Sequence, residues 1–98
     1  MPAYDISIEL RGEVDVAGDY RRLREAMNNS GFRHSISGND QKIYWLPRDV
    51  FSYQGEMTRQ EIMDKVYDLL TDFLPAPGVM VTESVGRSWR GLRQIDGF

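Results

Sequence analysis

The alternation of apolar and polar side chains near the start of the chain predicts a β-strand. Residues 4–11 alternate strictly, beginning with Tyr4 and ending with Arg11. Successive side chains of a strand point to opposite faces, so a period of two places all the apolar members on one face. We expect this strand to belong to an antiparallel sheet that has one face on the core and the other in water.

Two later stretches have apolar side chains at the spacing of amphipathic helices. The first stretch follows Gly18 or Asp19, either of which can cap it. Its apolar face consists of Tyr20, Leu23, Ala26 and Met27. Gly31 suits the left-handed backbone position that commonly follows the end of a helix.

The second of these stretches, 58–74, carries a clear start signal. Thr58 and Glu61 have the spacing of a capping box, in which each side chain bonds the backbone amide of the other residue. Pro75 and Pro77 end the helix because proline cannot donate to the helical hydrogen-bond ladder. The apolar stripe, which needs a partner layer, consists of Ile62, Val66, Leu69, Leu70 and Phe73.

Three further strands are predicted after the first helix. We expect the second strand over 32–46 with a break near SGND, the third over 49–55 and the fourth over 79–85. The turn-rich quartets SGND and LPRD are alternative positions for the central hairpin. The pattern does not choose between them.

Taken in order, the elements are strand, helix, strand, strand, helix, strand. This order predicts an α+β fold of the ferredoxin-like βαββαβ type, in which two helices cover one face of a four-stranded antiparallel sheet. The 98 residues suffice for a single domain, 1–98. Within it, residues 86–98 are expected to form either a short helix docked by Trp89 or a loose tail.

The composition is that of an ordinary globular protein, with 41% hydrophobic and 28% charged residues. No apolar run approaches the roughly 20 residues that cross a bilayer, and the N-terminus lacks the features of a signal peptide. The absence of cysteine excludes disulfides and thiolate chemistry and fits a reducing compartment. We therefore expect a cytoplasmic protein without a membrane partner.

The formal net charge of −3 conceals an uneven distribution of arginine. One group lies in the first helix and another in the tail: Arg21, Arg22 and Arg24, then Arg87, Arg90 and Arg93. Arginine is the side chain best shaped to hold phosphate at two points. In the alternative interpretation, both groups only keep their segments soluble or pair with acids.

Aromatic residues add a second candidate chemistry, because base stacking on aromatic rings is how many proteins hold single-stranded RNA. We select Tyr44 and Trp45 as candidate RNA contacts. Tyr53 and Trp89 are further candidates, although at least two of the four are expected to be core or dimer contacts. The RNP-type string of a standard RRM does not occur in the chain.

His34 is the only histidine and the natural candidate for acid–base chemistry near neutral pH. It shares a predicted strand face with Phe32 and Ile36, which favours a packing role. Acidic residues gather around the first strand and its exit: Asp5, Glu9, Glu13, Asp15 and Asp19. Their spacing does not indicate the convergence that a divalent metal needs, and no cofactor-binding loop occurs, so we expect no metal and no cofactor.

Four segments follow one another in a distinctive order: LREAMNNSGF, a turn-rich segment with LP, VFSYQGEMTRQEI and a valine-containing last strand. In this pattern, most of the chain resembles the GhoS family of endoribonuclease antitoxins. The resemblance implies a ferredoxin-like, usually dimeric protein of a bacterial type V toxin–antitoxin module that cleaves a toxin mRNA. The arginine of the family's first-helix pattern falls on Arg24. The RGEV insertion and the GRSWRGLRQ tail depart from the family pattern.

The leading hypothesis is therefore an RNA-binding protein, a homodimer, with endoribonuclease activity. Arg24, with Arg21 or Arg22, would hold the scissile phosphate and stabilise its developing charge. The tail arginines would extend the phosphate track, while Tyr44 or Trp45 would stack a base. The alternative is a non-catalytic interaction protein, such as a phage or defence accessory factor, that adds its sheet edge or open face to another protein.

Overall fold

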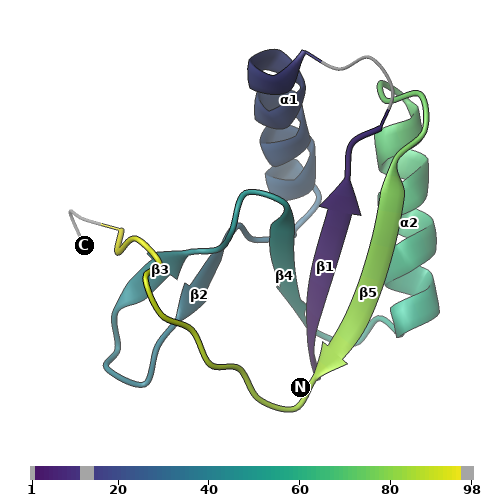
Figure 1. Ribbon diagram of the computed structural model, residues 1–98. Coiled ribbons are helices and arrows are strands. Elements are labelled where there is room, and N and C mark those ends of the chain that lie inside the picture. Colours follow the sequence, from purple (N-terminus) through teal and green to yellow (C-terminus); the bar gives the residue numbers. More distant parts are fainter. Residues whose placement is uncertain (1, 12–14, 96–98) are drawn as a thin grey trace.

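A computed structural model describes residues 2–11 and 15–95 of the chain (Figure 1). Parts of the sequence-based predictions lie outside these residues, namely Glu13 of the acidic group, positions 12–14 of the RGEV insertion and positions 96–98 of the tail. The described residues form an α+β domain with two helices and antiparallel sheets. Both helices lie on the same side of the larger sheet (Figure 1).

The larger sheet has three strands, and the N-terminal strand is at its centre. β1 (Ala3–Glu9) lies between β4 (Val50–Gln54) and β5 (Gly78–Ser84), and both pairings are antiparallel. Its even-numbered side chains are buried and its odd-numbered ones are more exposed, as the alternation predicts. The expected one-sided antiparallel sheet is therefore confirmed for this part of the chain.

The expected four-stranded sheet is divided into a three-stranded and a two-stranded one. β2 (Ser35–Ser37) and β3 (Ile43–Trp45) pair with each other and with no other named strand. A single bridge joins them to the larger sheet, with Arg33 N donating to Ser52 O at 2.9 Å and Ser52 N donating to Arg33 O at 2.7 Å. After Arg33 the chain bends away from β4, so the backbone hydrogen bonds between β2 and β4 do not continue past this bridge.

Both quartets that compete for the central hairpin are turns. SGND joins β2 to β3, where Gly38 N donates to Lys42 O at 2.8 Å. LPRD joins β3 to β4, where Val50 N donates to Pro47 O at 2.9 Å. The predicted second strand is therefore two short strands, and the break expected near SGND is a complete reversal of the chain.

The first helix, α1 (Val16–Asn29), starts earlier than predicted. Its N-cap is Asp15 instead of Gly18 or Asp19. Asp19 instead lies inside the first turn, where its carboxylate is favoured by the helix dipole and accepts from Asp15 N at 3.0 Å. The predicted end is confirmed, because Gly31 has a φ of 91° and follows the C-cap Ser30.

The second helix, α2 (Arg59–Thr71), has the predicted capping box. Thr58 Oγ1 accepts from Glu61 N at 3.1 Å, and Thr58 N donates to Glu61 Oε1 at 3.0 Å. These bonds to Thr58 hold the pKa of the Glu61 carboxyl below its ordinary value. The helix ends before the predicted position, although Leu74 N still donates to Leu70 O at 2.8 Å.

Removing this cap gives a local stability test. Thr58→Ala is expected to lower the free energy of unfolding by about 1 kcal/mol, because a backbone amide loses its acceptor. Thr71→Ala makes the same chemical change at the other end of α2, where the hydroxyl only donates back to Asp68 O. Urea unfolding followed by circular dichroism compares the variants, and equal losses would contradict the role of the box.

A single hydrophobic core lies between the sheet and the helices. β1 contributes Ile6 and Ile8, and β4 contributes Phe51. The helices add side chains from both predicted stripes, all of them buried: Tyr20, Leu23, Met27, Ile62, Val66 and Leu70. Leu69 and Phe73 are only partly buried at its border. Neither helix of the described residues is long and apolar enough to pass through a bilayer.

The C-terminal segment, 86–95, is neither a helix nor a loose end. It leaves β5 near the N-terminus and runs to the far side of β3 (Figure 1). There Trp45 N donates to Arg93 O at 2.9 Å, and Ile95 N donates to Ile43 O at 2.8 Å. The segment therefore pairs with the outer edge of β3 and brings tail residues into contact with the middle of the chain.

Candidate nucleic-acid interface

A hollow of about 540 Å³ lies where α1, the two-stranded sheet and the C-terminal segment meet. We call it the arginine hollow. It is lined by Arg24, His34, Trp45, Leu46, Arg48 and Arg93. Three guanidinium groups from segments far apart in the sequence thus surround the only histidine and a tryptophan.

Each arginine reaches the hollow by a different structural route. Arg24 follows Leu23, whose side chain is buried, so it stands on the exposed side of α1. Arg48 belongs to the LPRD turn between β3 and β4. Arg93 is brought in by the pairing of the C-terminal segment with β3. The convergence therefore depends on tertiary structure and is invisible as a sequence motif.

Arg48 is held in place without a strong ion pair. Its guanidinium lies over the ring of Tyr20, with 4.1 Å between Cζ and the ring centroid. Its Nε donates to Asp49 Oδ1 at 3.4 Å, which is a long bond between two exposed side chains. A pair of this kind contributes roughly 0–1 kcal/mol, so Arg48 can still hold an anion.

His34 is almost buried, with 9% of its surface exposed. Its Nδ1 lies 3.0 Å from the carbonyl oxygen of Val50, and its ring packs against Phe51 at a centroid distance of 4.7 Å. Burial lowers the pKa of His34 below its ordinary value of 6.5, against the hydrogen bond to Val50, and the positive charge of Arg24 lowers it further. The imidazole is therefore neutral at neutral pH.

Trp45 gives the hollow an aromatic surface. Its side chain is 46% exposed although its strand is short and paired on both edges. The indole lies 6.1 Å from the His34 ring at an angle of 43°. A half-exposed indole beside guanidinium groups is suited to stacking on a nucleotide base.

The structure brings three of the predicted site residues together: Arg24, Trp45 and Arg93. Tyr44 is engaged elsewhere, since its hydroxyl donates to Asp40 Oδ2 at 2.7 Å and its ring lies 5.8 Å from that of Trp89. The bond to Asp40 raises the pKa of Tyr44. The tyrosine thus helps to attach the C-terminal segment to the β2–β3 hairpin.

The remaining predicted arginines lie outside the hollow. Arg87 is paired with Asp5, with 2.6 Å between Nη2 and Oδ1, and this ion pair fastens the start of the C-terminal segment to β1. Arg22 lies over the ring of Phe73 at 4.8 Å, beside the end of α2. Arg21 and Arg90 are exposed and do not line the hollow.

Two polar residues of the hollow, Arg48 and His34, were not predicted as site residues from the sequence. Arg48 was outside both arginine groups because it stands alone in a turn between Pro47 and Asp49. The packing role expected for His34 is correct with respect to burial, but its ring also lines the hollow. The available signal was one basic residue, Arg48, in the turn directly after the strand that holds Trp45.

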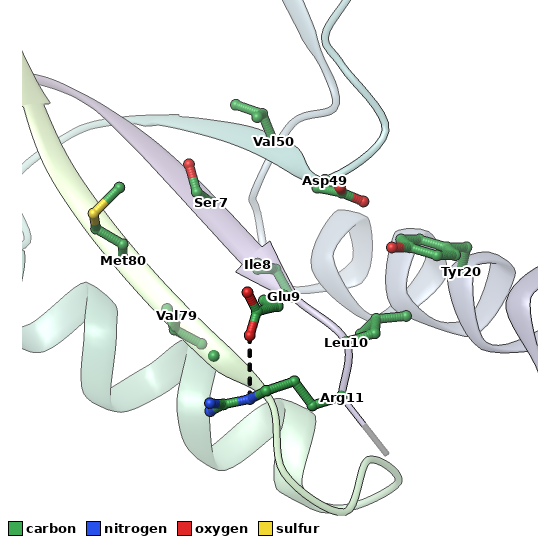
Figure 2. Close-up of a pocket in the computed structure, with 11 residues that line it drawn as sticks. Ser7, Ile8, Glu9, Leu10, Arg11, Tyr20, Asp49, Val50, Val79 and Met80 are labelled. Atoms are coloured by element: carbon green, nitrogen blue, oxygen red, sulfur yellow. Dashed lines mark ion pairs between the residues drawn. The ribbon is translucent and has the colours of Figure 1, made fainter. Parts of the chain in front are cut away.

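A second hollow, of about 580 Å³, lies at the end of β1 (Figure 2). Figure 2 shows Glu9 and Arg11 facing each other there, and their side chains form an ion pair at 3.3 Å. Tyr20 lies on the opposite side, where burial and Asp49 raise its pKa. Glu9 is paired with Arg11 and the Asp49 carboxylate with Arg48, so each of the two carboxylates that line this hollow already has a basic partner.

The predicted acidic group is dispersed, as its spacing suggested. Asp5 is paired with Arg87, Glu9 with Arg11, and Asp19 accepts from the backbone of Asp15. Among residues 2–11 and 15–95, no three or more histidine, cysteine or carboxylate side chains are grouped closely enough to hold a metal ion. By contrast, the arginine hollow brings together three side chains of the same charge. Comparison of the chain with models of known protein families and with curated proteins finds no match.

Proposed function

We propose that this protein binds single-stranded RNA at the arginine hollow. The observation that carries the proposal is the gathering of Arg24, Arg48 and Arg93 around one concave surface. The chain as a whole has a net charge of −3, so this local positive charge stands out against an acidic background. Guanidinium groups bind phosphate or carboxylate at two points, so such an arrangement favours an anionic ligand over a neutral one.

Trp45 extends the proposal from a phosphate to a nucleotide. Its exposed indole stands at the rim of the same hollow, so a base can stack there while the adjoining phosphate meets the arginines. A volume of about 540 Å³ is in the range of small-ligand sites and accommodates one nucleotide. Arg21 and Arg90, which are exposed, are suited to more distant phosphates of the strand.

The proposal also includes cleavage of the bound RNA, a ferredoxin-like fold and an antitoxin setting. In cleavage of a bound strand, Arg24 would stabilise the charge that develops on the scissile phosphate. The Arg33–Ser52 bridge continues the order β5, β1, β4 towards β2, which favours a ferredoxin-like fold with β3 as an added strand. An antitoxin acting on a toxin mRNA in the cytoplasm is the biological setting that the family resemblance implies.

A titration with a short fluorescent single-stranded RNA tests the binding proposal. Stacking contributes roughly 1–3 kcal/mol per base, so Trp45→Ala is expected to weaken binding by about 5-fold to 100-fold. Tyr67→Ala is the matched control, because Tyr67 is an aromatic of α2 with a similar exposure of 44%. Fluorescence anisotropy measures both variants. Equal affinities of Trp45→Ala and the wild type would contradict stacking at this hollow.

A second candidate function is supported by the outer edge of the larger sheet. β5 pairs only with β1 in that sheet, and the side chain of Met80 in β5 is 62% exposed. An open strand of this kind can add a partner's strand, either from another protein or from a second copy of this chain. Binding of a protein partner that is insensitive to salt, together with no measurable RNA affinity, would favour this non-catalytic function.

A further inference from the structure

We propose that the arginine hollow cleaves the RNA that it binds by attack of a ribose 2′-hydroxyl on the adjoining phosphate, with His34 Nε2 as the general base. This inference rests on the proposed RNA binding and adds to it a reaction and the atom that accepts the proton. It assigns His34 a role that neither its burial nor the resemblance to a known family suggests. Three features of the site support it.

The first feature is the tautomer of His34. Its Nδ1 lies 3.0 Å from the backbone oxygen of Val50, and a carbonyl oxygen can only accept a hydrogen bond. Nδ1 must therefore carry the hydrogen. In the neutral ring Nε2 then has a free lone pair, which is the form that a general base requires.

The second feature is access to Nε2. Among the described residues, the His34 ring makes no hydrogen bond besides the one through Nδ1. Within the same residues, no side-chain nitrogen or oxygen that is fully buried lacks a partner. Nε2 must therefore have solvent-accessible surface, and the hollow that His34 lines is the surface on which a ligand can meet it.

The third feature is the charge around the ring. Arg24 faces it from α1, Arg48 and Asp49 from the turn before β4, and Arg93 from the C-terminal segment. The positive charges outnumber the single carboxylate, so they disfavour protonation of the ring before substrate arrives. The same guanidinium groups are placed to stabilise the additional negative charge of a pentacoordinate phosphorus.

The proposed step balances without a metal or a co-reactant. Nε2 accepts the proton of the 2′-hydroxyl, and the 2′-oxygen forms a bond to phosphorus as the bond from phosphorus to the 5′-oxygen breaks. The leaving 5′-oxygen takes a proton from water, and His34 later returns its proton to solvent. The products are a 2′,3′-cyclic phosphate and a 5′-hydroxyl end.

The test uses the wild-type protein in EDTA with a labelled single-stranded RNA and its fully 2′-O-methylated counterpart. We expect both to bind and only the first to be cleaved, with cyclic-phosphate ends identified by mass spectrometry. His34→Asn keeps a donor for Val50 O and removes the base, so cleavage should fall by about 100-fold to 10,000-fold while RNA affinity changes little. The cleavage rate should also fall as the solution is acidified through the lowered pKa of His34.

The outcomes separate this inference from the proposed function. Binding of both strands without cleavage, cleavage of the methylated strand, or undiminished cleavage by His34→Asn would overturn the role of His34 and leave RNA binding intact. Failure of the wild type to bind either strand would overturn the proposed function itself. The methylated strand tests the chemistry with unaltered protein, so the result does not depend on the stability of the variant.

Discussion

Replacing Phe51 with alanine is expected to lower the free energy of unfolding by about 3–5 kcal/mol, because the change leaves a cavity in the centre of the core. Phe51 has 0% of its surface exposed and pairs with Ile6 of the central strand. Its ring also packs against His34 at 4.7 Å. The loss is a large fraction of the roughly 5–15 kcal/mol that stabilises a typical domain, so the variant is expected to unfold at a clearly lower temperature than the wild type.

Phe73→Ala is the matched control for this prediction. Phe73 loses the same atoms but is only partly buried, at the border of the core beside Arg22. Replacement of Phe73 should lower the free energy of unfolding by clearly less, because solvent and neighbouring side chains can fill the space. Urea unfolding measured by tryptophan fluorescence compares the two. A smaller loss for Phe51→Ala than for Phe73→Ala would mean that the core is centred elsewhere.

Combined replacement of Arg24, Arg48 and Arg93 with glutamine is expected to lower RNA affinity by roughly 100-fold at low salt. This follows because a hydrogen bond from a charged donor contributes roughly 1 kcal/mol more than one from a neutral donor, and glutamine keeps only a neutral donor at each position. Salt gives an independent readout. Three phosphate contacts predict a slope of about −2 for log affinity against log salt concentration, or a loss of about 20-fold between 50 and 200 mM. The variant should lose most of this slope.

The control for the arginine variant changes the same total charge outside the hollow. Arg11, Arg33 and Arg59 are exposed side chains that do not line it and have no place in the proposed RNA path, and their replacement with glutamine tests for a general charge effect. We expect this control to keep most of the affinity at moderate salt. Equal losses in the two triple variants, measured by anisotropy, would show that any RNA affinity comes from overall charge and not from the site.

Local patterns were enough to predict the parts of the fold whose determinants are close in sequence. The alternation of residues 4–11 identified the central strand, and the Thr58–Glu61 spacing identified the start of α2. Gly31 was correctly placed after α1 because its backbone conformation is rarely adopted by other residues. In each case, the physical cause operates within one turn or one strand.

Features that depend on contacts between distant segments were not predictable in this way. The division of the sheet arises at one bridge, between Arg33 and Ser52, after which pairing with β3 replaces pairing with β4. The β-propensity of the residues in β2 does not determine whether this strand pairs with β3 or with β4. Likewise, four of the six arginines selected from their clustering lie outside the hollow, whereas Arg48 reaches it from an unremarkable turn.

The path of the C-terminal segment sets the order in which the molecule is completed during translation. All the fully buried core side chains precede β5, whereas Arg93 follows the end of that strand. A nascent chain emerging from the ribosome can therefore bury its apolar surface before the third guanidinium group is available. Under the proposed function, full affinity for RNA would be acquired last, so an unfinished chain would bind the message from which it is being made more weakly than the completed protein does.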